Sequence, residues 1–340
     1  MDRRDFLKTG GAVVATGAAV VAPAGAAEPG PAVAPAILPG AKAITLATTW
    51  APQGPGAAHE RLARRIEMAT DGRYRIEVGA GADPDLVYGP AGRPADPAFA
   101  FFAGLPFGQG LDARAQQTWL AVGGGQTLWD DLAAERGFKP LVAGHTGAGG
   151  GVWSTARLEQ VSDLAGVTVG VQDGICADAV RALGAVPVAI DPGDVKAALA
   201  EGRVDAADWL APHAATDLQP LAQRLYRPGF KRDGVVLSLE VGLSLWERMS
   251  AADQAILEAC AAEEHRLSLA EAYAHALLAA PAETPAKWPV RLGFSAELSR
   301  ALEAAARDAV AGLARSSDVA RRIHDSHQAF RRMLGGGATA

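Results

Sequence analysis

Residues 167–210 alternate between short apolar runs and helical stretches, and this alternation limits the fold more than any other feature of the chain. Strands that alternate with helices in this way are parallel and are joined by helical crossovers, so the segment predicts an α/β domain. The expected order is a strand at 167–171, a helix at 176–184, a strand at 186–190, a helix at 193–201 capped by Asp191 and stopped by Gly202, and a strand at 204–210.

The stretch before it predicts a second α/β region. "AITLATTW" (43–50) has the composition of a strand, and "RYRIEVGAG" (73–81) alternates as a second strand does. Between them, Ala58, Leu62, Ile66 and Met68 recur near helical spacing, which indicates one buried helix face. Residues 83–97 contain four prolines, so we expect a loop there.

The middle and the end of the chain predict helices around one further strand. Residues 113–137 have the pattern of helices broken at the glycine triplet 123–125, which lacks the Lys-Ser/Thr of a phosphate-binding loop. "GFKPLVAGHTGAGGGVWS" indicates a strand and then a glycine-rich turn that carries His145 and Thr146. Residues 250–280 and 295–333 are predicted to be helical.

The first 27 residues have the form of a twin-arginine export signal. Arg3 and Arg4 precede a short apolar region that ends in small residues, and the segment is too short to span a membrane. The alternative is an ordinary apolar N-terminus. Residues 28–42, rich in proline and alanine, predict a flexible leader. Without residues 1–27 the chain has 29 basic and 36 acidic side chains, a net charge of −7 that gives no reason to expect nucleic acid or anionic lipid as partner.

Two cysteines, Cys176 and Cys260, leave two alternatives open. An exported protein can form a disulfide, but both residues lie in alanine-rich helical stretches, where two buried free thiols are at least as well supported. The chain has no CxxC, no HExxH and no zinc-type spacing, so we expect no structural metal.

Several stretches taken together resemble one family. They are "AFFAGLPFG", "TWLAVGGGQTLWDDL", "GHTGAGGGVW", "DLAGVTVGVQDG", "ALGAVPVAI", "DPGDVKAALAEGRVDAADWLAP" and "YRPGF", with a weaker continuation to "AFRRM". The chain resembles the extracytoplasmic solute receptors of tripartite ATP-independent periplasmic (TRAP) transporters, above all the branch that takes up 2-oxo acids. The resemblance covers nearly all of residues 42–333.

The resemblance implies a two-domain α/β periplasmic binding protein with mixed sheets and a helical C-terminal region. Its lobes would close on a solute, and the closed form would dock on the transporter's membrane subunits. We expect domain I at 43–142 with a return segment at about 234–265, and domain II at 143–233 with C-terminal helices at about 266–335. Family members are not enzymes, and no catalytic arrangement can be assembled from these residues. A monomer is expected, because the chain stops at "LGGGATA" without the long terminal helix through which some relatives dimerise.

The same resemblance points to a site with parts missing. In these receptors an arginine that pairs with the solute carboxylate stands where this chain has Gly170, and a glutamine stands where it has Gly149. The acid and tryptophan of a cation site persist as Asp208 and Trp209. We expect no cofactor; a cation that bridges the ligand would use Asp208. Residues 83–97 are shorter than in the family, so Tyr88 is a candidate to rebuild that wall of the cleft.

The remaining candidates each have an ordinary structural alternative. Asp208 is a ligand or hinge group, or it merely caps a neighbouring turn. Trp209 and Trp153 are expected to line the cleft, with plain core as the alternative, and Trp50 is open between the two. Gln172 and Asp173 face the cleft if the strand register is as drawn. Glu240, inside an apolar strand, contacts the ligand or pairs with Lys231 or Arg232, and His145 and Lys231 are further candidates.

Three functions follow, in decreasing order of support. The first is a TRAP-type receptor for a small polar solute: the family favours an organic acid, whereas the acidic balance of Asp208, Asp173 and Glu240 favours an amine or a neutral hydroxylated molecule. The second is a degenerate or sensory receptor homologue without a transport role. The third is an exported enzyme on the same fold.

Overall fold

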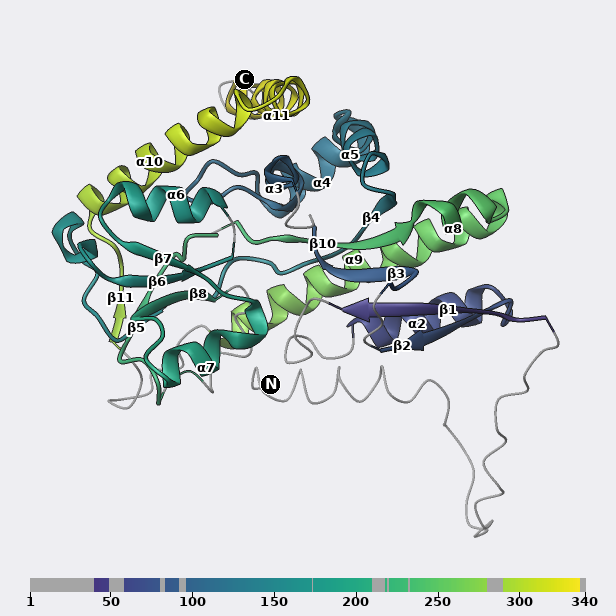
Figure 1. The fold of residues 1–340 in the computed structure, drawn as a ribbon, viewed down its shortest axis with the longest axis horizontal. Coiled ribbons are helices and arrows are strands. Elements are labelled where there is room, and N and C mark those ends of the chain that lie inside the picture. The colour runs from purple at the N-terminus through teal and green to yellow at the C-terminus, as the bar shows by residue number, and fades with distance from the viewer. Residues whose placement is uncertain are drawn as a thin grey trace, which may run out of the picture. The chain divides into compact units, whose positions relative to one another are not determined.

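The computed structural model describes residues 40–48, 58–79, 83–91, 96–172, 174–209, 218, 220–231, 233–279 and 290–336. The chain divides into two units, Met1–Ala41 and Lys42–Ala340. Every helix and strand described below belongs to the second unit (Figure 1). The predicted signal and most of the predicted leader therefore lie outside the described residues.

A five-stranded mixed sheet is built from both the beginning and the middle of the chain. β1 pairs in parallel with β2 and β3, whereas β10 pairs antiparallel with β3 on one side and β4 on the other. In spatial order the strands are β2 (Tyr74–Val78), β1 (Lys42–Thr48), β3 (Leu86–Pro90), β10 (Val236–Gly242) and β4 (Phe138–His145).

Strand β3 corrects the prediction that residues 83–97 form a loop. Its central residues are apolar and pair with a neighbour on each side. The prolines do not prevent this pairing, because Pro84 precedes the strand, Pro90 is its last residue and Pro97 begins the short 3₁₀ helix η1 (Pro97–Phe99). A proline at a strand end removes no ladder hydrogen bond from the middle of a sheet.

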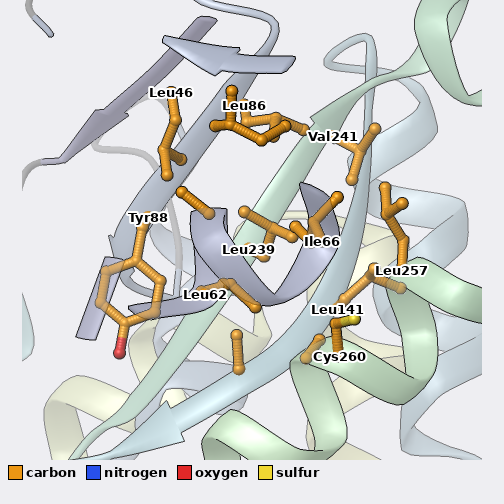
Figure 2. Close-up of a cluster of buried hydrophobic side chains, with 14 of the residues drawn as sticks. Leu46, Leu62, Ile66, Leu86, Tyr88, Leu141, Leu239, Val241, Leu257 and Cys260 are labelled. Carbon is orange, nitrogen blue, oxygen red and sulfur yellow. The ribbon is translucent and has the colours of Figure 1, made fainter. Parts of the chain in front are cut away.

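Helices α2 (Ala58–Ala69) and α9 (Ala251–Ala279) pack on this sheet and enclose an aliphatic core (Figure 2). The predicted helix face is confirmed for Ala58, Leu62 and Ile66, which are buried. The prediction for Met68 is wrong, since its side chain is 73% exposed. Two residues after Ile66 a helix has turned by about 200°, so Met68 points away from the core.

A second, aromatic core lies under short helices. The expected helix break is confirmed: α4 (Ala113–Val122) ends at Gly123, and Gly124 takes a left-handed conformation before α5 (Gly125–Ala134). Phe102 stacks between Trp119 and Trp129, with ring centroids 5.6 and 5.3 Å away. α3 (Ala100–Ala103) and α11 (Asp318–Gly336) complete this core.

A six-stranded mixed sheet contains the predicted β-α-β segment. β6 pairs in parallel with β7 and β8, as expected, and α6 (Gly174–Ala182) and α7 (Val195–Ala200) are the predicted crossovers. Asp191 is not a side-chain cap; it precedes a 3₁₀ turn, η3 (Pro192–Asp194), without a capping hydrogen bond. In order the strands are β11 (Val290–Leu292), β9 (Arg224–Tyr226), β5 (Gly151–Ser154), β8 (Ala206–Trp209), β6 (Thr168–Val171) and β7 (Val186–Ala189).

The predicted C-terminal helices are confirmed as α10 (Ala296–Ala314) and α11, with α9 for 250–280. α10 packs on α6, and α8 (Leu243–Arg248) follows β10 directly. Cys176 and Cys260 are free thiols buried in different cores, one under each sheet. In the described part of the chain no helix is long and apolar enough to cross a membrane.

Candidate functional site

The strand directions decide where a site can form. β3 and β4 are both antiparallel to β10, so β1, β3 and β4 run the same way and end at one edge of the first sheet. In the second sheet β6 and β8 run together and β5 opposes β8, which places Gly151 at the start of β5 opposite Trp209 at the end of β8. Ligands of open α/β sheets bind at the carboxyl ends of parallel strands.

Two segments join these carboxyl edges. Residues 146–150, the first crossing, lead from the end of β4 to the start of β5. Residues 227–235, the second crossing, lead from the end of β9 to the start of β10, which pairs with the end of β4 through Val236 and His145. Both crossings thus connect the two edges at which ligands bind, and they define the candidate site.

The two crossings are packed backbone to backbone. The Thr146 N–H donates to the Val235 carbonyl at 2.9 Å, and the Val235 N–H donates to Thr146 Oγ1 at 2.9 Å. Only glycine fits at position 234, because a Cβ there would lie 1.8 Å from the Gly147 carbonyl oxygen. Thr146 was a residue of the predicted glycine-rich turn, whereas Gly234 had no predicted role. The Asp233-Gly234 pair was the available signal in the sequence, because such pairs occur in turns where glycine takes a positive φ, as Gly234 does here.

Asp208 anchors the second crossing. It is 6% exposed, and its carboxylate accepts the backbone N–H of Phe230 at 3.1 Å and of Lys231 at 3.2 Å. Gly229 lies so close that a Cβ there would be 2.4 Å from Asp208 Oδ1. The Asp208 carboxylate thus binds a neighbouring turn in this structure. Gly229, within the quoted "YRPGF", was not assigned this role.

Lys231 is a buried cation at the same place. Its side chain is shielded from solvent, and the ammonium group donates to the carbonyl oxygen of Gly104, which follows α3. The second crossing therefore contacts a loop of the aromatic core as well as Asp208. Glu240 is also buried, on β10 between Val87 and Pro140, away from the start of that strand.

The tryptophans differ from each other. Trp209 is partly exposed and packs against the cores of both sheets, as a residue at their junction does. Trp153 does not line a cleft: it is fully buried in the core under α7, next to Ile190 and Ala207. The indole N–H of each is buried without a hydrogen-bond partner among the described residues. Trp50 and Asp173 lie outside the described residues.

Gly170 does not face open space. A Cβ at this residue would lie 2.4 Å from Ile190 Cδ1 and 3.2 Å from Ala207 Cβ. Both residues belong to the buried core that also contains Trp153. A side chain at position 170 would have to displace Ile190 before it could reach a solute. Gln172, partly buried, follows β6 directly at the carboxyl edge.

Tyr88 is a core residue and does not rebuild a cleft wall. Its side chain is fully buried, and its ring lies at the margin of the aliphatic cluster with the hydroxyl pointing away from the leucines (Figure 2). Burial, with Glu264 and Glu271 nearby, raises the pKa of Tyr88. These two carboxylates bind Arg61 of α2, with Arg61 Nη2 2.5 Å from Glu264 Oε1 and 3.0 Å from Glu271 Oε2. The ion pairs fasten α9 to α2.

The described residues do not form a metal site. They contain no group of three or more His, Cys, Asp or Glu side chains that could hold an ion. Asp208, the expected ligand, has both oxygens directed at backbone amides and is crowded by Gly229. Gly149, where the resemblance implied a glutamine, has no side chain that could bind an ion.

Comparison with known proteins gives one family and one fold. The model of a family described as bacterial extracellular solute-binding protein, family 7 (DctP), matches residues 89–280. Over 241 residues the chain is 30% identical to the monocarboxylate 2-oxoacid-binding periplasmic protein of a Nostoc species. That alignment covers 64% of this chain and 65% of the relative, so the chain matches a little less than two thirds of the relative's length.

Solved structures confirm the predicted fold. A TRAP transporter solute-binding protein from Bordetella bronchiseptica, with calcium and picolinate bound, superposes with a TM-score of 0.79 at 24% identity and covers 87% of this chain and 93% of its own. One from Colwellia psychrerythraea, with calcium and pyruvate bound, has a TM-score of 0.79 at 20% identity, and the match covers 87% of this chain and 96% of that one. One from Pseudoalteromonas atlantica, with sodium and pyruvate bound, has a TM-score of 0.76 at 20% identity, and the match covers 87% of this chain and 95% of that one. The two mixed sheets with their helices are the two-domain architecture of these proteins.

Proposed function

The chain belongs to family 7 of the bacterial extracellular solute-binding proteins, and we propose that it captures a small organic acid where its two crossings join the carboxyl edges of its sheets. The observation that carries this proposal is the topology: both crossings connect the edges at which α/β sheets bind ligands. A solute bound there would contact the regions built on both sheets and would favour an arrangement in which these regions close on it.

The solute class is inferred from the charges at the junction and from the relatives. The negative charge of Asp208 is already bound by two backbone N–H groups, which weakens the argument for an amine. Lys231 is a buried cation at the same junction, and its ammonium group donates to the Gly104 carbonyl. A relative named for monocarboxylate 2-oxoacids and two structures with pyruvate agree with this choice. Family membership supports substrate binding and not the degenerate or sensory alternative.

A thermal-shift screen tests the solute class. The purified protein is heated with pyruvate, with other monocarboxylates, and with amines, polyols and sugars, each with and without calcium or sodium. A solute at 100 times its Kd adds about 2.7 kcal/mol to the free energy of unfolding, which is a clear rise in Tm. We expect that rise with monocarboxylates. A rise with amines or polyols alone would contradict the proposal.

The cellular setting belongs to the same proposal. We infer export by the twin-arginine route, a periplasmic location, delivery to TRAP membrane subunits and no enzymatic activity, in keeping with the family and its periplasmic relative. Changing Arg3 and Arg4 together to Lys should leave uncleaved precursor in the cytoplasm. Undiminished periplasmic protein would count against the export route.

We also propose that the protein is a monomer in solution. Light scattering at micromolar concentration checks this, with a single-chain mass as the expected result. A dimer mass would overturn it.

A further inference from the structure

His145 lies at the point where the chain leaves the first sheet. It is the last residue of β4 and is 3% exposed. Its Nδ1 accepts the backbone N–H of Gly147 at 3.0 Å, two residues into the first crossing. The backbone N–H of His145 donates to Ser268 Oγ of α9 at 3.1 Å. The side chain thus fixes the turn with which the first crossing begins.

The turn that His145 holds has little room to move. Gly147 has a φ of +70°, and a Cβ there would lie 2.7 Å from Ala272 Cβ on α9. On the other side, a Cβ at Gly234 would lie 1.8 Å from the Gly147 carbonyl oxygen and 2.7 Å from His145 Cε1. The first crossing therefore fits between α9 and the second crossing in this conformation, and a shift of Gly147 would move both crossings.

The hydrogen bond also fixes the proton on the imidazole. The Gly147 N–H is a donor, so Nδ1 carries no proton and the neutral ring has its hydrogen on Nε2. Protonation would place a second donor opposite the Gly147 N–H and break this contact. Burial lowers the pKa of His145 to about 3, with a smaller contribution from His265, so the ring stays neutral at ordinary pH.

The surroundings contain few other charges. From α9 the titratable group that faces His145 is His265, whose ring lies 6.3 Å away at 79° and whose own pKa is lowered by burial. The charged side chains in the described part of the second crossing are Arg227, Lys231 and Asp233, with Lys231 directed to the Gly104 carbonyl. On β10 the residue opposite is Val236, which is uncharged.

We propose that His145 is a positioning residue for solute binding: as a neutral acceptor it holds Gly147, and with it the joint between the two sheets, in the geometry that the solute meets. The solute-binding part of this proposal rests on the proposed function. The structural part does not, and it can be measured without any solute.

The test compares three variants of the whole protein. His145→Leu removes the acceptor at similar volume, whereas His145→Asn supplies an amide oxygen that can accept the same N–H and does not titrate. His327→Leu is the matched control, because His327 is also fully buried with a pKa lowered to about 3, but lies among Phe101 and Trp119, remote in sequence and contacts from the crossings. All three are compared with the native chain.

The first readout is NMR of the imidazole nitrogens and of amide exchange. In the native protein we expect an unprotonated Nδ1 on His145. In His145→Leu the Gly147 amide should exchange about two- to tenfold faster, the factor for one neutral hydrogen bond, and His145→Asn should restore protection. Native exchange at Gly147 in His145→Leu, or equal loss in His327→Leu, would overturn the proposal.

The second readout is calorimetric titration with pyruvate at neutral pH. We expect His145→Leu to bind pyruvate about two- to tenfold more weakly, and His145→Asn and His327→Leu to bind it as the native protein does. Unchanged affinity in His145→Leu overturns the positioning role. If the native protein binds no pyruvate, the proposed solute class fails instead, and the Gly147 exchange rates still decide the role of His145.

Discussion

Gly229 approaches Asp208 so closely that a single methyl group on it would lie 2.4 Å from Asp208 Oδ1. The carboxylate needs this closeness, because it accepts the N–H groups of the next two residues, Phe230 and Lys231. The same methyl group would also lie 3.0 Å from the Cα of Gly151, at the start of β5. Asp208, the second crossing and β5 are thus held together at one residue without a side chain.

Replacing Gly229 by alanine should destabilise the protein by about 1–3 kcal/mol, as expected for overpacking that separates a buried carboxylate from its donors. Urea unfolding followed by circular dichroism measures the loss. Gly312→Ala in α10 is the matched control, since its Cβ meets nothing within 4 Å, and it should stabilise by up to about 1 kcal/mol. A Gly229→Ala protein as stable as the native one would show that Asp208 can move aside.

The contact between Gly170 and Ile190 predicts a compensating pair. Gly170→Ala puts a methyl group 2.4 Å from Ile190 Cδ1 and should cost about 1–3 kcal/mol. Ile190→Val removes that Cδ1 atom and by itself should cost about 0.5–1.5 kcal/mol. The double variant should lose less than the two losses added, in a double-mutant cycle from denaturant unfolding. Strict additivity would mean that the two residues do not meet.

Two buried tyrosines should respond differently to loss of the hydroxyl. The Tyr226 hydroxyl accepts the Leu158 N–H at 2.8 Å, so Tyr226→Phe leaves a buried donor unpaired and should cost about 1–3 kcal/mol. The Tyr88 hydroxyl is buried and has no hydrogen-bond partner among the residues that the structure describes, so Tyr88→Phe should be neutral or slightly stabilising. Thermal unfolding of both variants checks this, and a loss for Tyr88→Phe as large as for Tyr226→Phe would reveal a partner.

Buried histidines should make the protein sensitive to acid. Burial lowers the pKa of His327 from 6.5 to about 3, so the unfolded chain binds a proton more readily between these values. The free energy of unfolding is therefore unaffected by this histidine above pH 6.5, and it decreases as the pH falls from 6.5 toward 3. Because His327→Leu has no such group, its free energy of unfolding should rise relative to that of the native protein by up to about 1.4 kcal/mol for each pH unit by which the pH is lowered over that range. Denaturant unfolding at several pH values tests this, and parallel curves for the two proteins would contradict it.

The sequence predicted most of the α/β order, because the elements there have strong local patterns. The strands at 168–171 and 186–189 are short apolar runs bounded by turns, and the helices of residues 251–279 and 296–314 are long. It failed at β3, where four prolines outweighed the apolar run Leu86–Tyr88, because proline position within a strand depends on partners that the sequence does not name.

The site was less predictable for a related reason. Whether Trp153 or Tyr88 faces solvent depends on which element covers it, and α7 and α9 come from distant parts of the chain. The close approaches at Gly229 and Gly234 likewise arise between segments that are far apart in sequence, such as 147 and 234. The sequence shows that a glycine is present at a position, but not which distant segment of the backbone packs against it.

The place of β10 in the first sheet has a consequence for how the protein is made. β3 and β4 are not neighbours; β10 lies between them and pairs with both. As the chain grows on the ribosome, β4 has no partner in this sheet until residues 236–242 have left the exit tunnel. These residues are synthesised almost a hundred positions after the end of β4. A truncated product that ends before residue 236 would expose two open sheet edges at once, and such edges invite pairing with other chains.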